Sequence, residues 1–113
     1  MDFSRTDIYD RIRVKLQSLD GPLHVLVNNV GTAHSLPEYF ASDADGYHLG
    51  LINTNIVSMT LMAEIVLRIW TNNKQPIGQQ QGRRPKGVMI NVSSGSGLLE
   101  TPLYASYSAC KWW

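Results

Sequence analysis

Apolar residues recur at helical spacing in two stretches of this chain and form short continuous runs in two others. In the first helical stretch the apolar positions follow one another at steps of three or four, as Ile8, Ile12, Leu16 and Leu19. This spacing places them on one face of a helix, which we expect to pack on a sheet. Ser4 and Thr6 are candidate N-caps of this helix, and Gly21-Pro22 ends it.

The two continuous apolar runs predict strands. The first covers residues 23–27 and is interrupted only by His24, and the second is GVMINV, residues 87–92. Short apolar runs between helices are typical of strands that are buried in a parallel sheet. The order helix, strand, helix, strand therefore predicts an α/β fold.

The second helical stretch runs from Leu49 to Trp70, and its apolar residues cover more than one face. Such a helix is buried on two sides, and we expect it to lie between its sheet and a second copy of the chain. The stretch is long enough to cross a membrane. Four polar or charged residues argue against that reading, because each is costly in hydrocarbon: Asn53, Asn55, Glu64 and Arg68.

The remaining segments are predicted loops. In residues 34–42, Tyr39 and Phe40 are expected to anchor the loop, and Ser42 is a candidate cap of the long helix with Asp45 reaching back. Residues 72–86 are polar, rich in glutamine and broken by proline and glycine, which predicts a solvated loop.

Composition fits one small globular domain. The chain has 113 residues, of which 43% are hydrophobic and 17% charged, and a net charge of +1 that gives no electrostatic basis for binding nucleic acid. Its single cysteine, Cys110, fits a reducing compartment and is expected to be a packing residue. His24, His34 and His48 lack metal-ligand spacing, so no metal site is predicted.

Candidate chemistry lies near the C-terminus. Tyr107 and Lys111 stand four residues apart in YSACK, and Ser94 precedes them on a predicted loop. In a helix this spacing places the phenol and the ammonium on one face. A neighbouring cation favours the phenolate, which makes the tyrosine a usable general acid or base. Ser94 is positioned to hold a substrate oxygen beside it.

Several motifs carry a resemblance to a known family. LVNNVG after the first strand, the serine in NVSSGSG after the second, and YSACK resemble the motifs of the short-chain dehydrogenase/reductases. DFSRTDIYDRI and PEYF are most similar to the branch of 17-beta-hydroxysteroid dehydrogenases and very-long-chain 3-oxoacyl-CoA reductases. The resemblance runs from Asp2 to Lys111. It implies hydride transfer between a nicotinamide cofactor and a 3-oxoacyl thioester or keto-steroid.

The resemblance also implies roles for particular residues. Tyr107 would donate a proton to the carbonyl oxygen, Lys111 would assist it and bond the nicotinamide ribose, and Ser94 would orient the carbonyl. Asn55 matches the family's fourth catalytic residue, which holds a helix kink and a water that relays protons toward the lysine. Asn53, two positions earlier, is a second candidate for that role. The structural alternative is that the asparagine only bonds the backbone of its own helix.

Cofactor-binding residues follow from the same resemblance. Asn28, Asn29 and Gly31 come after a strand, where open α/β sheets place their ligands, and Asp2 matches an acid that contacts the adenine ring. Tyr107 and Lys111 belong to this set as well. We expect NADP(H) in preference to NAD(H).

The chain corresponds to only part of the family's fold. The strand and glycine-rich turn that hold the pyrophosphate do not occur in these 113 residues. We expect a partial Rossmann-like, doubly wound parallel sheet over residues 1–113, comprising the end of the third strand at Asp2-Phe3 and the fourth and fifth strands, without the later strands and substrate lid.

Two further expectations concern partners and location. The Leu49–Trp70 helix is the expected homodimer contact. The branch is anchored in the endoplasmic reticulum by an upstream segment, whereas this chain expressed alone would be cytoplasmic. The alternative function is an inactive fragment or splice product that pairs with full-length subunits. On either reading, the isolated chain is expected to bind NAD(P) poorly and to form no stable soluble monomer.

Overall fold

The computed structural model describes residues 1–72 and 87–112, so the predicted loop lies outside the described residues from residue 73 on. Its helices and strands are, in chain order, α1 (Tyr9–Gln17), β1 (Val25–Asn28), α2 (Tyr47–Ile52), α3 (Ser58–Asn72), β2 (Val88–Asn91) and α4 (Ala105–Lys111). Short 3-10 turns cover Phe40–Ser42 and Gly95–Gly97, and a π turn, Asn53–Val57, joins α2 to α3.

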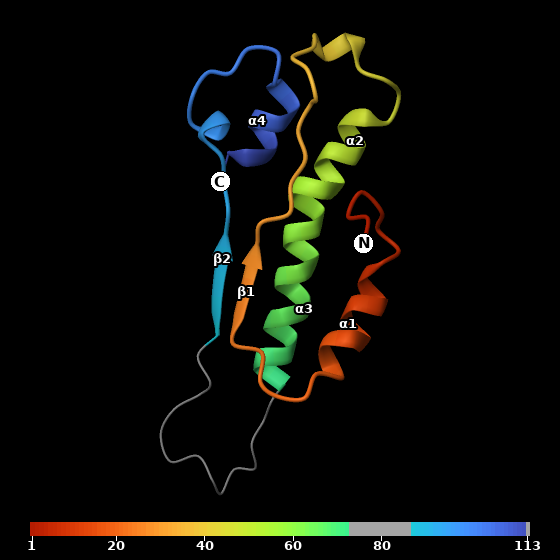
Figure 1. Cartoon of the computed structure of the whole chain (residues 1–113), viewed down its shortest axis with the longest axis vertical. Helices are drawn as coiled ribbons and strands as arrows, with labels where there is room; N and C mark the ends of the chain where they lie inside the picture. The colour runs from red at the N-terminus through yellow and green to blue at the C-terminus, as the bar shows by residue number, and fades with distance from the viewer. Residues whose placement is uncertain (73–86, 113) are drawn as a thin grey trace, which may run out of the picture.

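The two strands pair in parallel, as predicted. Val25 lies opposite Val88 and Asn28 opposite Asn91. A helix connects them, so the described residues form the partial α/β unit that the pattern predicted. Both strands end toward the part of the molecule that contains α4 (Figure 1).

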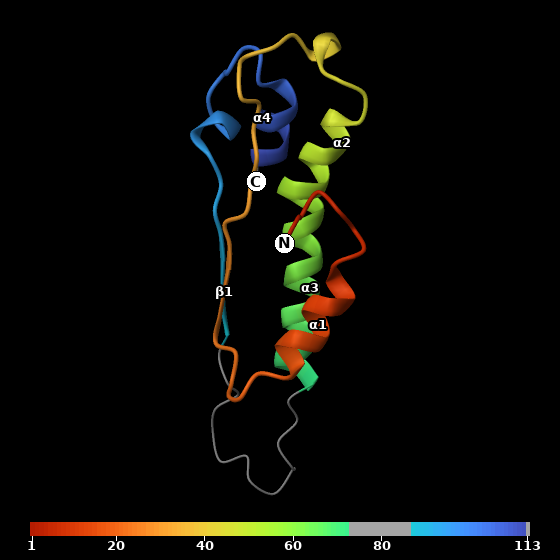
Figure 2. The ribbon, with the colours of Figure 1, turned by 45° about the vertical axis from the view of Figure 1, so that its right-hand side comes forward.

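The α2–α3 helix lies against the sheet, and α1 packs alongside α3 (Figures 1 and 2). The prediction that α1 packs on the sheet is therefore wrong. Its apolar face instead joins a core cluster made of Ile8, Tyr9, Ile12 and Ile65. The reason is that the apolar surface of α3 is wider than one stripe, so α3 contacts α1 as well as the sheet.

The N-terminal segment differs from prediction in two respects. Asp2 and Phe3 do not form a strand, because the Asp2 carboxylate accepts hydrogen bonds from Ser4 N at 2.9 Å and Ser4 Oγ at 2.7 Å and closes a local turn. Ser4 and Thr6 do not cap α1, which begins at Tyr9 with Ile8 at its N-cap and no side-chain cap.

The strands are less buried than predicted. Val25 and Val27 are 50% and 51% exposed, and Val88 and Ile90 are 51% and 47% exposed. Their side chains alternate with partly buried ones along each strand. The helix covers one face of the sheet, and in the described part of the chain the opposite face stays open, which accounts for this pattern.

The start of the long helix also departs from prediction. Gly46, with a φ of 81°, occupies the N-cap of α2, and no cap bond comes from Ser42 or Asp45. A positive φ at this position favours glycine. Tyr39 is 73% exposed, whereas Phe40, although 63% exposed, stacks on His48 of α2 and lies with its carbonyl oxygen 3.0 Å from His48 Nε2, so Phe40 anchors the loop as predicted.

Residues Tyr47–Thr71 form one continuous helical stretch of 25 residues, whose most apolar 18-residue window has a mean hydropathy of 1.4, so it is long and apolar enough to cross a membrane. The core helix of a globular protein has the same properties, so the stretch by itself does not distinguish the two environments.

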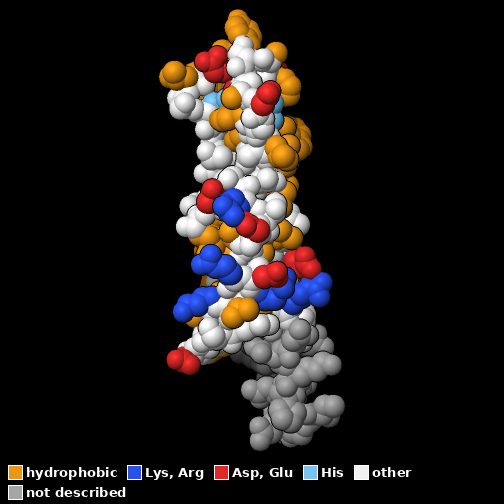
Figure 3. Space-filling model, turned by 90° about the vertical axis from the view of Figure 1, so that its right-hand side faces the viewer, with side chains coloured by type: hydrophobic (Ala, Val, Ile, Leu, Met, Phe, Trp, Pro, Cys, Tyr) orange, Lys and Arg blue, Asp and Glu red, His pale blue; other side chains and the backbone are white. Residues whose placement is uncertain are grey.

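Figure 3 shows charged side chains gathered over α1 on one face of the molecule. Ion pairs form between Arg5 and Asp7, just before α1, and between Arg13 and Asp10 within it.

Candidate active site

The predicted site residues lie where the two strands end. β1 leads into Asn29 and Gly31, and β2 leads into Ser94, while α4 carries Tyr107 and Lys111 past both strand ends (Figure 1). Ligands of open α/β sheets bind outside the carboxyl ends of the strands. The fold therefore brings residues that are far apart in the sequence to the edge at which such a site is expected.

Asn55 is 1% exposed and lies inside the π turn Asn53–Val57. Its Nδ2 donates to Thr32 O at 2.8 Å and to Leu51 O at 2.9 Å, and its Oδ1 accepts from Thr32 N at 3.2 Å. The side chain thus bonds its own helix and clamps the loop after β1. π turns occur mostly as single bulges inside helices and often at functional sites. The family resemblance implies a helix kink at Asn55, and the bond to Leu51 O is also what the structural alternative predicts.

Asn53, the rival in register, points elsewhere. Its Nδ2 donates to Ser4 O at 2.9 Å, in the N-terminal segment. The structure therefore places Asn55, and not Asn53, beside the loop that follows β1.

Lys111 is 5% exposed, and its Nζ donates to Val92 O at 3.4 Å. Gly31 lies directly beside this ammonium. A Cβ on Gly31 would stand 3.1 Å from Lys111 Nζ and 2.9 Å from Asn55 Oδ1. The absence of a side chain at this position allows the backbone to approach both groups. Gly31, Asn55 and Lys111 thus converge at one point, which their separation in the sequence does not reveal.

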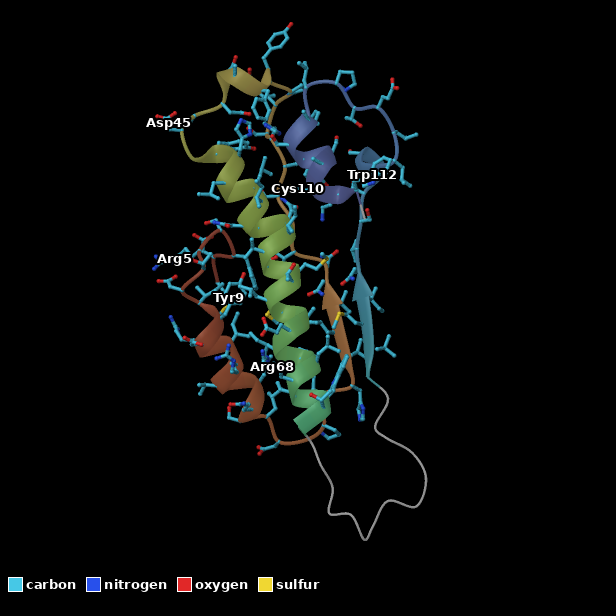
Figure 4. All side chains as sticks on the ribbon, turned by 180° about the vertical axis from the view of Figure 1, so that it is seen from behind. Arg5, Tyr9, Asp45, Arg68, Cys110 and Trp112 are labelled. Atoms are coloured by element: carbon cyan, nitrogen blue, oxygen red, sulfur yellow. The ribbon has the colours of Figure 1, made fainter. Side chains whose placement is uncertain are left out.

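The C-terminal end of α4 is fixed by the loop after β2. Ser93 Oγ donates to Lys111 O at 2.6 Å, and a Cβ on Gly97 would overlap the same carbonyl oxygen. Cys110 is 2% exposed, which confirms it as a packing residue, and burial raises the pKa of its thiol although Lys111 partly opposes this. Figure 4 shows Cys110 and Trp112 on opposite sides of this end of the helix.

Ser94 and Tyr107 lie on the two elements that follow β2. Ser94 is the N-cap of the 3-10 turn Gly95–Gly97, where its Oγ accepts from Ser96 N at 3.3 Å. Tyr107 is partly buried on α4, one helical turn before Lys111. The Ser94 hydroxyl therefore comes from the start of the 3-10 turn after β2, and the Tyr107 phenol and the Lys111 ammonium come from α4.

The predicted cofactor residues are divided between structural and exposed positions. Asn28 Nδ2 donates to Asn91 Oδ1 at 2.9 Å and joins the two strands, whereas Asn29 is exposed. Asp2 lines a hollow of about 440 Å³ together with Val30, Thr32 and residues of α2. Hydrogen bonds from Ser4 hold the pKa of the Asp2 carboxyl below its ordinary value, so the group is charged at neutral pH.

A second polar cluster was not predicted from the sequence. His34 Nε2 lies 2.9 Å from Asp43 Oδ2, with both side chains buried, and His48 Nδ1 lies 2.8 Å from Ser106 Oγ. The second pair is 58 positions apart in the chain, so no local spacing signals it. In residues 1–72 and 87–112 no group of three or more His, Cys, Asp or Glu side chains is arranged to hold a metal ion.

Comparison with known proteins extends the sequence resemblance. The family model for short chain dehydrogenases matches residues 1–113. Human very-long-chain 3-oxoacyl-CoA reductase is 40% identical over 113 residues, which cover 98% of this chain and 32% of the human protein. Mouse 17-beta-hydroxysteroid dehydrogenase type 3 is 40% identical over 111 residues, with coverages of 97% and 32%. The chain spans about a third of the length of these curated relatives.

Solved structures share the fold. 4-hydroxyisoleucine dehydrogenase complexed with NADH and succinate aligns with a TM-score of 0.76 at 24% identity, covering 98% of this chain and 46% of that one. ElxO with NADP bound aligns with a TM-score of 0.74 at 24% identity, with coverages of 98% and 40%. The match of the family model along the whole chain and the 40% identity to curated relatives agree with this fold. The chain therefore belongs to the short-chain dehydrogenase family of oxidoreductases.

Proposed function

We propose that this chain carries the catalytic residues of an enzyme that moves a hydride between a nicotinamide cofactor and a carbonyl or alcohol. The observation that carries the proposal is the convergence of Lys111 Nζ and Asn55 Oδ1 beside Gly31, at the carboxyl ends of the strands. A buried ammonium and a buried amide are costly unless they serve a structure or a site. Here both face the edge at which ligands of this fold bind.

In the reducing direction each side chain has a distinct task. The Tyr107 hydroxyl gives its proton to the substrate's carbonyl oxygen, and the Lys111 ammonium stabilises the phenolate that is left. The Ser94 hydroxyl donates a hydrogen bond to the same carbonyl oxygen and polarises it. Asn55 holds the loop at Thr32 and supports the return of a proton toward Lys111. The nicotinamide, when bound, supplies the hydride to the carbonyl carbon.

The residues around the strand ends fit a nicotinamide cofactor. Gly31 has no side chain to block a close approach along the loop, and Asn29 is exposed beside it. Asp2 lies at the edge of the hollow that Val30 and Thr32 line, in a position suited to the adenine ring. Asn28 braces the two strands beneath. Structures that share the fold are complexed with NADH or have NADP bound, and we propose NADP(H) as the preferred form.

We propose a 3-oxoacyl thioester or a keto-steroid as substrate. The relatives are named for such compounds. Leu98, Leu99 and Leu103 are 81%, 72% and 38% exposed, and they follow Ser94 along the chain. They give the entrance of the site an apolar surface that suits a lipid or steroid. A location at the endoplasmic reticulum membrane, with an anchor supplied by a segment other than these residues, belongs to the same proposal.

A second candidate function is an inactive piece that pairs with longer subunits. It is favoured by the exposed apolar residues of the long helix, among them Leu49 at 61% and Leu67 at 49%, and by the half-exposed face of the sheet. Exposed apolar surface of this kind suits a protein partner. The same exposed apolar residues would also serve as the contact of a homodimer of the active enzyme. A measurement of enzymatic activity therefore distinguishes the two candidate functions.

The test uses a hybrid protein in which residues 1–113 replace the matching segment of human very-long-chain 3-oxoacyl-CoA reductase. We expect the hybrid to oxidise NADPH with a 3-oxoacyl-CoA. Tyr107→Phe should lower kcat by about 10² to 10⁴, as loss of a general acid does, without weakening NADPH binding. Tyr104→Phe removes the phenol of the N-cap residue of α4 and should change kcat by less than about threefold.

Two outcomes would contradict the proposal. A Tyr107→Phe hybrid that keeps more than about a tenth of the rate would show that this phenol is not the proton donor. A folded hybrid that reduces neither a 3-oxoacyl-CoA nor a keto-steroid with either cofactor would favour the second candidate.

A further inference from the structure

We infer that His48 is a positioning residue for Tyr107, and that it acts through Ser106 at the N-terminal end of α4. The contact itself is independent of the proposed function, whereas its kinetic consequence rests on that function. Neither residue belongs to the site built above, and the two are separated by 58 positions in the chain.

α4 depends on tertiary contacts for its position. It has seven residues, and its N-cap, Tyr104, makes no side-chain cap bond. A helix this short has little stability of its own. Its C-terminal end is held by Ser93 and Gly97. At its N-terminal end, the bond between Ser106 Oγ and His48 Nδ1, at 2.8 Å, ties the helix to α2.

The hydrogen-bonding partners of His48 define the direction of this bond. Nε2 lies 3.0 Å from Phe40 O, and a carbonyl oxygen only accepts, so Nε2 carries a hydrogen. In the neutral ring, Nδ1 is then the acceptor, and the Ser106 hydroxyl donates to it. The ring of Phe40 stacks on the imidazole, with centroids 4.1 Å apart and an angle of 12° between the planes. A rotation of the imidazole would break both hydrogen bonds and the stack.

A neighbouring pair, His34 and Asp43, adds a second contact with the start of α4. His34 and Asp43 are joined at 2.9 Å with side chains 5% and 7% exposed. His34 also meets Tyr104 edge-on, with ring centroids 5.7 Å apart. Asp43 Oδ2 lies 3.7 Å from His48 Nε2 as well. The loop after β1 and the start of α2 thus contact the first turn of α4 through two histidines.

Ser106 immediately precedes Tyr107, so the bond to His48 sets the rotation of α4 about its axis. Consecutive residues of a helix point about 100° apart, and a fixed Ser106 therefore fixes the direction of the phenol. Displacement of a reacting group by about 1 Å can cost 10²-fold in rate. A looser α4 should lower the rate of the proton transfer without changing how tightly the substrate is held.

The kinetic test is a double-mutant cycle in the hybrid protein. His48→Phe keeps the ring stack and removes both nitrogens, and Ser106→Ala removes the hydroxyl. We expect each change to lower kcat by about five- to tenfold with KM within about twofold, and the double variant to be no slower than the slower single one. Ser106→Thr, which retains the hydroxyl, should restore most of the rate.

Ser108→Ala is the matched control, because Ser108 Oγ is buried without a hydrogen-bond partner in the described part of the chain. Its kcat should stay within about twofold of the unaltered hybrid. If the effects of His48→Phe and Ser106→Ala multiply instead, the two residues act separately and the inference is wrong.

Hydrogen exchange on the folded hybrid protein supplies a readout that needs no turnover. The amide of Ser108 donates to Tyr104 O at 2.8 Å within α4. His48→Phe should speed its exchange about five- to tenfold and leave the amides of α1 unchanged. Unchanged exchange at Ser108 in His48→Phe would overturn the inference, whatever the activity. So would exchange of the Ser108 amide at the rate of an unfolded peptide in the unsubstituted protein. Faster exchange in His48→Phe together with an inactive hybrid would refute only the proposed function.

Discussion

The two ends of the molecule are built from different kinds of buried side chain. At the α1 end, the core cluster is Ile8, Tyr9, Ile12 and Ile65, packed between two regular helices. At the α4 end, the buried polar or charged side chains Thr54, Asn55, Ser58 and Lys111 accompany the buried apolar residues Leu51 and Cys110. The first end stabilises the fold by removing apolar surface from water. The second end loses stability wherever a buried polar group lacks its partner.

Local backbone geometry follows the same division. α3 is a regular helix over Ser58–Asn72, whereas the π turn Asn53–Val57 lies at the polar end. Ser58 Oγ bonds Thr54 O at 2.6 Å and Asn55 bonds Leu51 O, so side chains satisfy carbonyls in and around the bulge. Geometry that is costly for a helix is therefore kept at the end where the candidate site lies. From this comparison we expect that many substitutions at the two ends will perturb stability and chemistry separately.

The largest expected effect at the polar end comes from Gly97→Ala. The new Cβ would overlap Lys111 O, and backbone cannot move aside as a flexible side chain can. We expect the free energy of unfolding of the hybrid to fall by about 3 kcal/mol, measured by urea denaturation. Gly95→Ala in the same 3-10 turn, with no atom within 4 Å of its Cβ, should change it by less than about 0.5 kcal/mol. Equal effects would mean that α4 does not pack on this turn.

A smaller effect is expected from the Cys110 thiol at high pH. Burial raises the pKa of this thiol in the folded state, so the unfolded chain loses the thiol proton at a lower pH than the folded one. The free energy of unfolding should therefore fall as pH rises through the ordinary thiol range, by at most about 1.4 kcal/mol per pH unit. Cys110→Ala should show a shallower decline over that range. Parallel curves for the two proteins would indicate that the thiol is accessible to water.

The smallest effect concerns the surface pair Glu64–Arg68 on α3. Arg68 bonds Glu64 Oε1 through two nitrogens, at 2.9 and 2.6 Å, but the two side chains are 50% and 68% exposed. Exposed pairs four residues apart contribute about 0.3–0.5 kcal/mol. Arg68→Ala should therefore change the urea midpoint only slightly, and less in 0.5 M salt, where charges are screened over about 4 Å. A loss above about 1.5 kcal/mol would assign this pair a structural role that its exposure does not indicate.

Much of the fold could be predicted because its signals are local. The helical spacing around Ile12 and the apolar runs that became β1 and β2 each lie within a few residues. The spacing of Tyr107 and Lys111 in one short helix is local in the same sense. Family resemblance supplied Asn55, which no periodicity in the long helix distinguishes from Asn53.

What could not be predicted depends on contacts between distant segments. The placement of Gly31 against both Asn55 and Lys111, and the pairing of His48 with Ser106, have no local sequence pattern. The expected cap by Ser4 failed because its hydroxyl bonds Asp2 instead. Local capping rules describe what a side chain can do, while tertiary contacts and competing local turns decide what it does.

The most direct test of the division between the two ends compares Asn55→Ala with Ile65→Ala in the hybrid protein. Asn55 clamps Thr32 at the candidate site, and Ile65 is 3% exposed in the apolar core. Both kcat and the urea midpoint are measured, at a temperature at which both variants are folded. Ile65→Ala should lower the free energy of unfolding by about 2–5 kcal/mol and leave kcat within about twofold, whereas Asn55→Ala should lower kcat about tenfold or more. An Asn55→Ala hybrid with full kcat, or an Ile65→Ala hybrid that is equally slowed while folded, would contradict the assignment of the chemistry to the polar end.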